Sequence, residues 1–141
     1  MHSDSLSLEL ARFKTPRSRG GGKLEGGLWA SPVNPNTNSS AWMEHMKTYW
    51  PGWEATGFRF DLHKNASLLE LHEPEHVEAL PRIALEGNRV NWDRVLHEND
   101  AIFIAQNIAR IGLFIDWAVS SLVVFNPRVV INQEPIERFV A

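Results

Sequence analysis

The sequence predicts an α+β domain in which strands outnumber helices. Three observations lead to this prediction. Apolar residues alternate with polar ones at Phe58, Phe60 and Leu62, short apolar runs occur at 101–105 and 121–125, and the helix candidates are short. Alternation is the period of a half-buried strand, and a short apolar run bounded by turn residues is typical of a buried strand.

Length and composition fit a single domain, residues 1–141. With 43% apolar residues, six Trp and seven Phe, a chain of 141 residues can bury a core. The net charge of −3 lacks the positive surface that non-specific nucleic-acid binding needs. The absence of cysteine excludes disulfides and thiolate metal sites. No apolar run reaches transmembrane length, so we expect a cytoplasmic protein without a membrane partner.

The N-terminal part is expected to alternate strands and loops. Leucines alternate with polar residues over 6–10, which predicts a strand that ends near Arg12. Residues 14–26 are rich in Arg and Gly, which favours a flexible loop. A second strand is expected over 27–31.

A helix is expected over 41–49, because Ser39 or Ser40 can cap its N-terminus and Pro51-Gly52 can end it. The residues expected on one face of this helix are Trp42, His45, Met46 and Tyr49.

The remaining elements follow from shorter signals. Strands are expected over 58–62 and 67–71, and Pro74 fits the first turn of a helix that runs to Leu80. Asn91 can cap the next helix. The segments after it are a buried strand at 101–105, an ambiguous stretch at 108–117, and strands at 121–125 and 128–131.

Two segments resemble known ligand-binding motifs, but each lacks a feature that its motif requires. The segment 17–23 offers glycine amides and a lysine for phosphate binding, but Lys23 is followed by Leu24 instead of the Ser or Thr of a phosphate loop. His72 and His76 have the spacing of a zinc-binding helix, but Pro74 interrupts that helix. We therefore expect no stable metal site and interpret both segments as solvated.

Aromatic rings and hydroxyls occur together at two places that a turn separates. Gly27, Trp29 and Ser31 combine a glycine for close backbone approach with an indole and a hydroxyl. Ser39 and Trp42 repeat the hydroxyl and the indole. A planar ring such as nicotinamide or adenine binds between such groups, although aromatic residues at helical spacing also occur in ordinary cores.

Taken in order, these motifs resemble the ADP-ribosyltransferase superfamily, in particular its compact members related to poly(ADP-ribose) polymerases and to small phage or toxin transferases. The segments that carry the resemblance are Arg12, Gly27-Leu28-Trp29-Ala30-Ser31, Ser39-Ser40-Ala41-Trp42, 58–71, Asn99-Asp100-Ala101-Ile102 and Ser121-Leu122-Val123-Val124-Phe125-Asn126-Pro127.

The resemblance implies a split antiparallel β-sheet clamp with short flanking helices around NAD, which would be the substrate. Trp29 and Trp42 would face the nicotinamide and Ser39 would bind its amide. A serine and the backbone near Gly27 would hold the ring, which makes Ser31 a further candidate. Arg12 would orient the ribose or a phosphate. The strands 27–31 and 121–125 would lie side by side.

The sequence departs from the family at the position of its usual catalytic glutamate. Ser121 stands there, and the nearest acid in the sequence is Asp116. A serine has no negative charge and should stabilise an oxocarbenium ion far less. The first hypothesis is thus an NAD-dependent mono-ADP-ribosyltransferase, a phage or bacterial effector that modifies a protein or nucleic acid through Ser121 and Asp116. The alternative is a catalytically silent relative that binds NAD, a derived nucleotide or a partner protein. A zinc hydrolase is the third hypothesis.

Overall fold

The computed structural model describes residues 2–3, 17–18, 24–114 and 117–141. It is a mixed α and β structure in which strands take up more of the chain than helices, as the sequence predicts. The strand expected over 6–10 lies outside the described residues, and so do Arg12 and Asp116.

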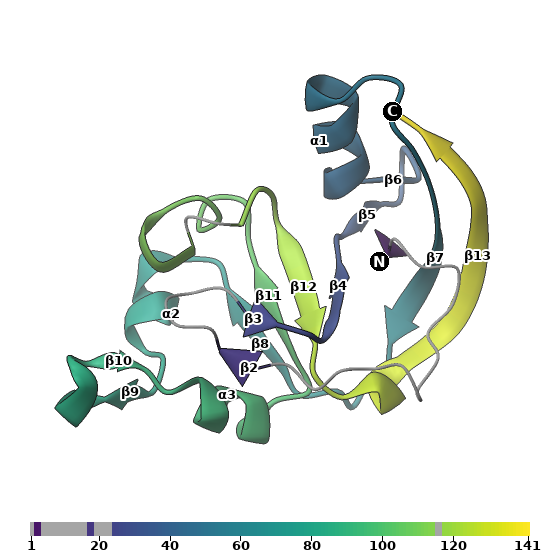
Figure 1. The fold of residues 1–141 in the computed structure, drawn as a ribbon. Helices are drawn as coiled ribbons and strands as arrows, with labels where there is room; N and C mark the ends of the chain where they lie inside the picture. The colour runs from purple at the N-terminus through teal and green to yellow at the C-terminus, as the bar shows by residue number, and fades with distance from the viewer. Residues whose placement is uncertain (1, 4–16, 19–23, 115–116) are drawn as a thin grey trace.

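A four-stranded sheet with the spatial order β4-β12-β11-β8 forms the centre of the fold (Figure 1). Its strands are β4 (Leu28–Ala30), β12 (Ser121–Val124), β11 (Ala101–Ile104) and β8 (Leu68–Leu71). β12 is antiparallel to both β4 and β11, whereas β11 is parallel to β8. The parallel pair differs from the antiparallel sheet that the sequence predicts. The helices between β8 and β11 explain it, because they carry the chain back to the end where β8 began.

The strand that bears Trp29 lies beside the late apolar strand, as predicted. In the β4–β12 ladder, Trp29 lies opposite Val123 and Leu28 lies opposite Val124. Residues almost a hundred positions apart in the sequence are therefore neighbours in the sheet.

A second, three-stranded antiparallel sheet stands beside the first one (Figure 1). Its order is β1 (His2–Ser3), β7 (Glu54–Leu62) and β13 (Val130–Val140). β13 begins two residues later than the strand predicted over 128–131, because a 3₁₀ turn occupies Pro127–Val129. It is also much longer than predicted and continues to Val140. Its register against β7 shifts twice, and Asn132 adopts a φ of 53° at the first shift.

Among the described residues, the other strands form three short antiparallel pairs. They are β2 (Arg17–Ser18) with β3 (Leu24–Glu25), β5 (Val33–Asn34) with β6 (Ser39–Ser40), and β9 (Arg82–Ile83) with β10 (Arg89–Val90). The first pair falls within 14–26, where the sequence predicts a flexible loop. In the described part of this segment, Arg17 lies opposite Glu25 in a short ladder and the Leu24 side chain is buried.

The helices begin close to their predicted capping residues. Helix α1 spans Ala41–Tyr49 with Ser40 as its cap, α2 spans Pro74–Glu78, and α3 spans Trp92–Glu98 with Asn91 as its cap. The buried side chains of α1 are Met43 and Met46, while Tyr49 is 57% exposed, so the predicted face is only partly right. All helices of the described residues are too short to cross a membrane.

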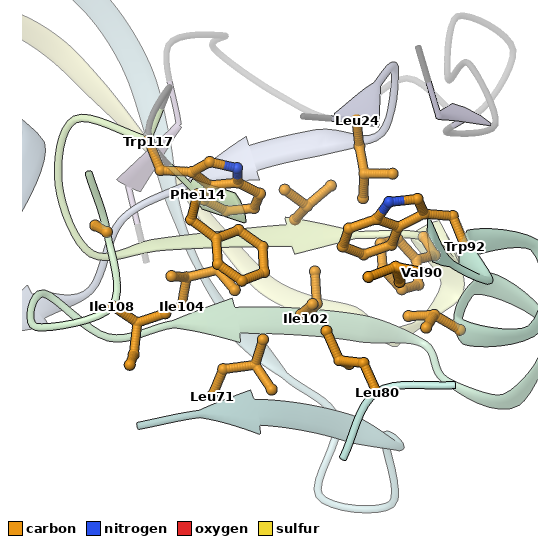
Figure 2. Close-up of a cluster of buried hydrophobic side chains, with 14 residues drawn as sticks. Leu24, Leu71, Leu80, Val90, Trp92, Ile102, Ile104, Ile108, Phe114 and Trp117 are labelled. Atoms are coloured by element: carbon orange, nitrogen blue, oxygen red, sulfur yellow. The ribbon is translucent and has the colours of Figure 1, made fainter. Parts of the chain in front are cut away.

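Both faces of the four-stranded sheet are buried. Figure 2 shows the first cluster, which covers one face and includes Leu71, Ile102, Ile104, Phe114, Trp117 and Trp92. The second cluster joins the other face to the three-stranded sheet and includes Leu28, Leu122, Val124, Phe58, Phe60 and Val130. Burial on both faces explains why β11 and β12 are continuous apolar runs instead of alternating ones.

Alanine variants of Ser40 and Ser39 test which hydroxyl caps the N-terminus of α1. The Ser40 Oγ accepts a hydrogen bond from the backbone N–H of Met43 (3.1 Å) and is 1% exposed. We expect Ser40→Ala to lower the free energy of unfolding by about 1 kcal/mol, because that N–H loses its partner. Ser39→Ala should cost less than about 0.5 kcal/mol, since its contact is exposed. Urea unfolding of both variants measures this difference, and equal losses would contradict the assignment.

Candidate functional site

A cavity of about 180 Å³ lies between the two sheets and helix α1. β4, α1, β7, β13 and the residue that begins β12 each contribute to its wall. The lining residues are Trp29, Ala30, Ser31, Trp42, Met43, Ala55, Thr56, Gly57, Ser121, Ile136 and Phe139.

Trp29 connects the cavity wall to the first cluster. Its indole ring lies against that of Trp117, with ring centroids 4.6 Å apart. The Trp29 Nε1 donates to the backbone oxygen of Gly26 at 3.0 Å. These contacts hold the half-buried indole in one orientation at the cavity.

Trp42 belongs to an aromatic group on the opposite wall. Its ring meets the Trp53 ring edge-on, with centroids 4.8 Å apart and planes at 80°. Phe139 lies 6.3 Å from Trp42 and 6.4 Å from Trp53 between centroids. Because α1, β7 and β13 all contribute to this wall, Trp42 is fixed by tertiary packing as well as by its helix.

Two serine hydroxyls at the cavity have complementary hydrogen-bonding roles. The Ser31 side chain is buried, and its Oγ accepts from the backbone N–H of Trp42 at 3.2 Å. The Ser121 Oγ donates to the backbone oxygen of Val119 at 2.8 Å. Ser31 therefore retains its O–H as a donor, while Ser121 retains its lone pairs as an acceptor.

The described lining of the cavity is electrically neutral, because it contains no Asp, Glu, His, Lys or Arg. Two arginines of the flanking strands are engaged elsewhere. The Arg59 guanidinium donates to the Asn38 Oδ1 at 2.8 Å, and that of Arg138 pairs with Glu54 at 2.6 Å. Such a wall, with indole rings and no cation, suits a planar ring better than a phosphate.

The structure brings together four of the predicted site residues: Trp29, Ser31, Trp42 and Ser121. Gly27 lies outside the lining, in the turn before β4, where its φ of 74° favours glycine. Ser39 also lies outside it and lines a separate shallow hollow with Glu44. Arg12 and Asp116 are not among the described residues.

The wall formed by β7 and β13 is the part that sequence reasoning missed. Ala55, Thr56 and Gly57 come from β7, and Ile136 and Phe139 come from β13. A glycine within a strand signals close approach of another group, so Gly57 could have indicated this wall. Ile136 and Phe139 carry no comparable signal.

The histidines of the zinc-like motif have structural contacts. The Nδ1 of His76 accepts from the backbone N–H of His72 at 3.0 Å and from that of Glu73 at 3.3 Å. This ring thereby caps the first turn of α2. Within the described ranges, no three His, Asp or Glu side chains are grouped so as to hold a metal ion. Nothing in this arrangement favours the zinc hydrolase.

None of the known protein families, curated proteins or solved structures compared with the chain matches it. The functional interpretation therefore depends on the cavity and on its chemistry.

The contact between Ser39 and Glu44 predicts a measurable pKa change. The Ser39 hydroxyl donates to the Glu44 carboxylate at 2.5 Å, and this bond, followed by Lys47, holds the pKa of Glu44 below its usual 4.5. We expect Ser39→Ala to raise the pKa of Glu44 toward 4.5, as measured by carboxyl NMR titration.

The sign of the linked stability follows from the lowered pKa. A carboxylate whose folded pKa lies below its unfolded value adds stability above that unfolded value, and the gain is lost as the pH falls through the lowered pKa. Ser39→Ala should therefore cost stability at about pH 7 and little at about pH 2. An unchanged Glu44 pKa in this variant would show that the Ser39 hydroxyl is available to bind a ligand.

Proposed function

We propose that the protein binds the nicotinamide ring of NAD, or of a related nucleotide, in the cavity between the two sheets, as a catalytically silent relative of ADP-ribosyltransferases. The observation that carries the proposal is the convergence of Trp29, Ser31, Trp42 and Ser121 on one uncharged cavity. Their sequence positions alone led to the expectation of a ring-binding site.

The two hydroxyls match the hydrogen bonds of a carboxamide. Nicotinamide carries an amide whose oxygen accepts and whose nitrogen donates. The Ser31 O–H is available to the oxygen, and the Ser121 lone pairs are available to the nitrogen. An uncharged, partly apolar pocket with a few polar groups is the usual form of a small-molecule site.

The size of the cavity limits how much of the ligand it can hold. Sites for drug-sized ligands occupy about 300–1,000 Å³, whereas this cavity has about 180 Å³. One ring fits that volume, and the rest of a dinucleotide would lie outside it. No cation lines the described wall, so the pyrophosphate finds no partner within the cavity.

The proposed relationship to ADP-ribosyltransferases also extends to the fold of the chain. The pairing of β4 with β12 and the position of the cavity between two sheets support an ADP-ribosyltransferase-like clamp. The parallel β8–β11 pair is a departure from the antiparallel sheets expected of it.

ADP-ribosyl transfer is the second candidate function, because Ser121 lies at the cavity in the position that the family resemblance gives to a catalytic glutamate. An oxocarbenium ion needs negative charge nearby, and no carboxylate is part of the described lining. The chemistry of the wall therefore favours binding over transfer.

Thr56→Trp tests where the ring binds. Thr56 is exposed and lines the cavity, and an indole there should fill the space while suiting a strand. We expect calorimetry to detect NAD and nicotinamide binding to the wild-type chain and none to Thr56→Trp. The control is Thr48→Trp, an exposed site on α1 outside the lining, which should bind like wild type. Unimpaired binding to Thr56→Trp would place the ligand elsewhere.

A second measurement separates binding from transfer. We expect NAD to remain intact during prolonged incubation with the protein and cell lysate, with no free nicotinamide by chromatography and no label on any macromolecule. Nicotinamide release that disappears in Asp116→Ala would reverse the order of the two candidates, because Asp116 would then supply the missing carboxylate.

A further inference from the structure

β8 is an outer strand of the four-stranded sheet, at the edge opposite β4. In the described part of the chain it pairs with β11 alone, from Leu68 opposite Ala101 to Leu71 opposite Ile104. An outer strand presents a row of backbone donors and acceptors to any chain that lies alongside it.

The direction of the β8 backbone groups follows from its bonds to β11. The backbone oxygens of Ser67 and Leu71 accept from residues of the β11 segment. Because successive residues of a strand alternate in direction, the N–H and C=O groups of Leu68 and Glu70 point away from β11. Neither residue's backbone has a hydrogen-bond partner on that side in the described residues.

A groove of about 400 Å³ runs beside this edge, between β8 and the helices α2 and α3. Its floor is apolar, since Leu71, Leu80 and Val95 are buried members of the first cluster that also line the groove. Figure 2 shows Leu71 and Leu80 at the margin of the first cluster, on the side of β8. The groove can therefore take apolar side chains from a strand added to β8.

The surroundings of the groove are acidic. Residues 68–100 contain eight Asp and Glu but only three Arg and no Lys. Glu70 and Glu98 line the groove; Glu98 is paired with Arg94 at 2.8 Å, and Glu70 contacts the His72 ring at 3.2 Å. Glu75 and Glu78 are exposed on α2 and have no ion pair with another described residue. This charge favours a basic partner and opposes an acidic one.

We propose that the outer edge of β8 and its groove bind an extended peptide of another protein in which apolar and basic residues alternate. The peptide extends the sheet through the outward backbone groups of Leu68 and Glu70. Its apolar side chains enter the groove, and its basic side chains point to the other face of the sheet, which is the face of Glu70. In strand addition, main-chain hydrogen bonds usually supply affinity and alternate side chains supply specificity.

The direct test uses the full chain and an eight-residue peptide of alternating Val and Lys. At saturation we expect amide exchange at Leu68 and Glu70 to slow by about tenfold, because their N–H groups become hydrogen-bonded. The same peptide with Glu in place of Lys should not bind. Binding without protection of these two amides, or equal binding of both peptides, would overturn the proposal.

Two variants of Glu70 separate the contribution of its backbone N–H to peptide affinity from that of its carboxylate charge. Glu70→Pro removes an outward N–H and leaves the ladder to β11 intact, so peptide affinity should fall about tenfold. Glu70→Gln keeps that N–H, and its affinity should fall only about two- to threefold, by the worth of one exposed charge pair. Unchanged affinity in Glu70→Pro would refute strand addition.

Amide hydrogen exchange and sedimentation of the wild-type chain test the proposal without any variant. If Glu70→Pro does not fold, the exchange measurement with the two peptides still decides whether a strand adds to β8. Dimerisation of the protein in sedimentation experiments, with protection of Leu68 and Glu70 before any peptide is added, would show that a second copy occupies the edge and would overturn the proposal.

Discussion

The pairing of β4 with β12 is the interaction on which the rest of the structure depends. It joins Leu28 and Trp29 to Val124 and Val123 across most of the chain. Because side chains alternate along each strand, this one ladder supplies residues to both cores: Leu28 and Val124 belong to the second cluster, and Val123 belongs to the first. It also brings Trp29, Ser31 and Ser121 to the same cavity.

The cavity exists because the packing between the sheets stops along β7. Phe58 and Phe60 are almost completely buried and fill the space between the sheets, with ring centroids 5.5 Å apart. The next position on the same face of β7 is Thr56, a smaller residue that lines the cavity. Because threonine is smaller than phenylalanine, a gap remains at this position. Trp42 of α1 and Phe139 of β13 form the side wall of that gap.

Elements with local signals could be predicted from the sequence, whereas features set by distant partners could not. Helix α1 has its predicted bounds because a capping serine and a Pro-Gly pair mark its ends. The exposure of Tyr49 and the parallel β8–β11 pair depend on which segments pack nearby, and no local pattern encodes that. The same holds within the site. Ser31 and Ser39 look alike in the sequence, but only Ser31 lines the cavity, whereas Ser39 lies in the β5–β6 pair and its hydroxyl is bonded to Glu44.

The two proposed sites are at opposite edges of one sheet, since the order β4-β12-β11-β8 places the cavity beside the first strand and the peptide groove beside the last. The strands between them are almost fully buried on both faces, so coupling between the sites requires a packed side chain or element with a second discrete arrangement. Within the described part of the chain, Trp29 is the cavity residue whose ring packs directly on a ring of the first cluster, that of Trp117. A ligand that leaves the Trp29 ring in place leaves the groove unchanged, so occupancy of the two sites should be independent.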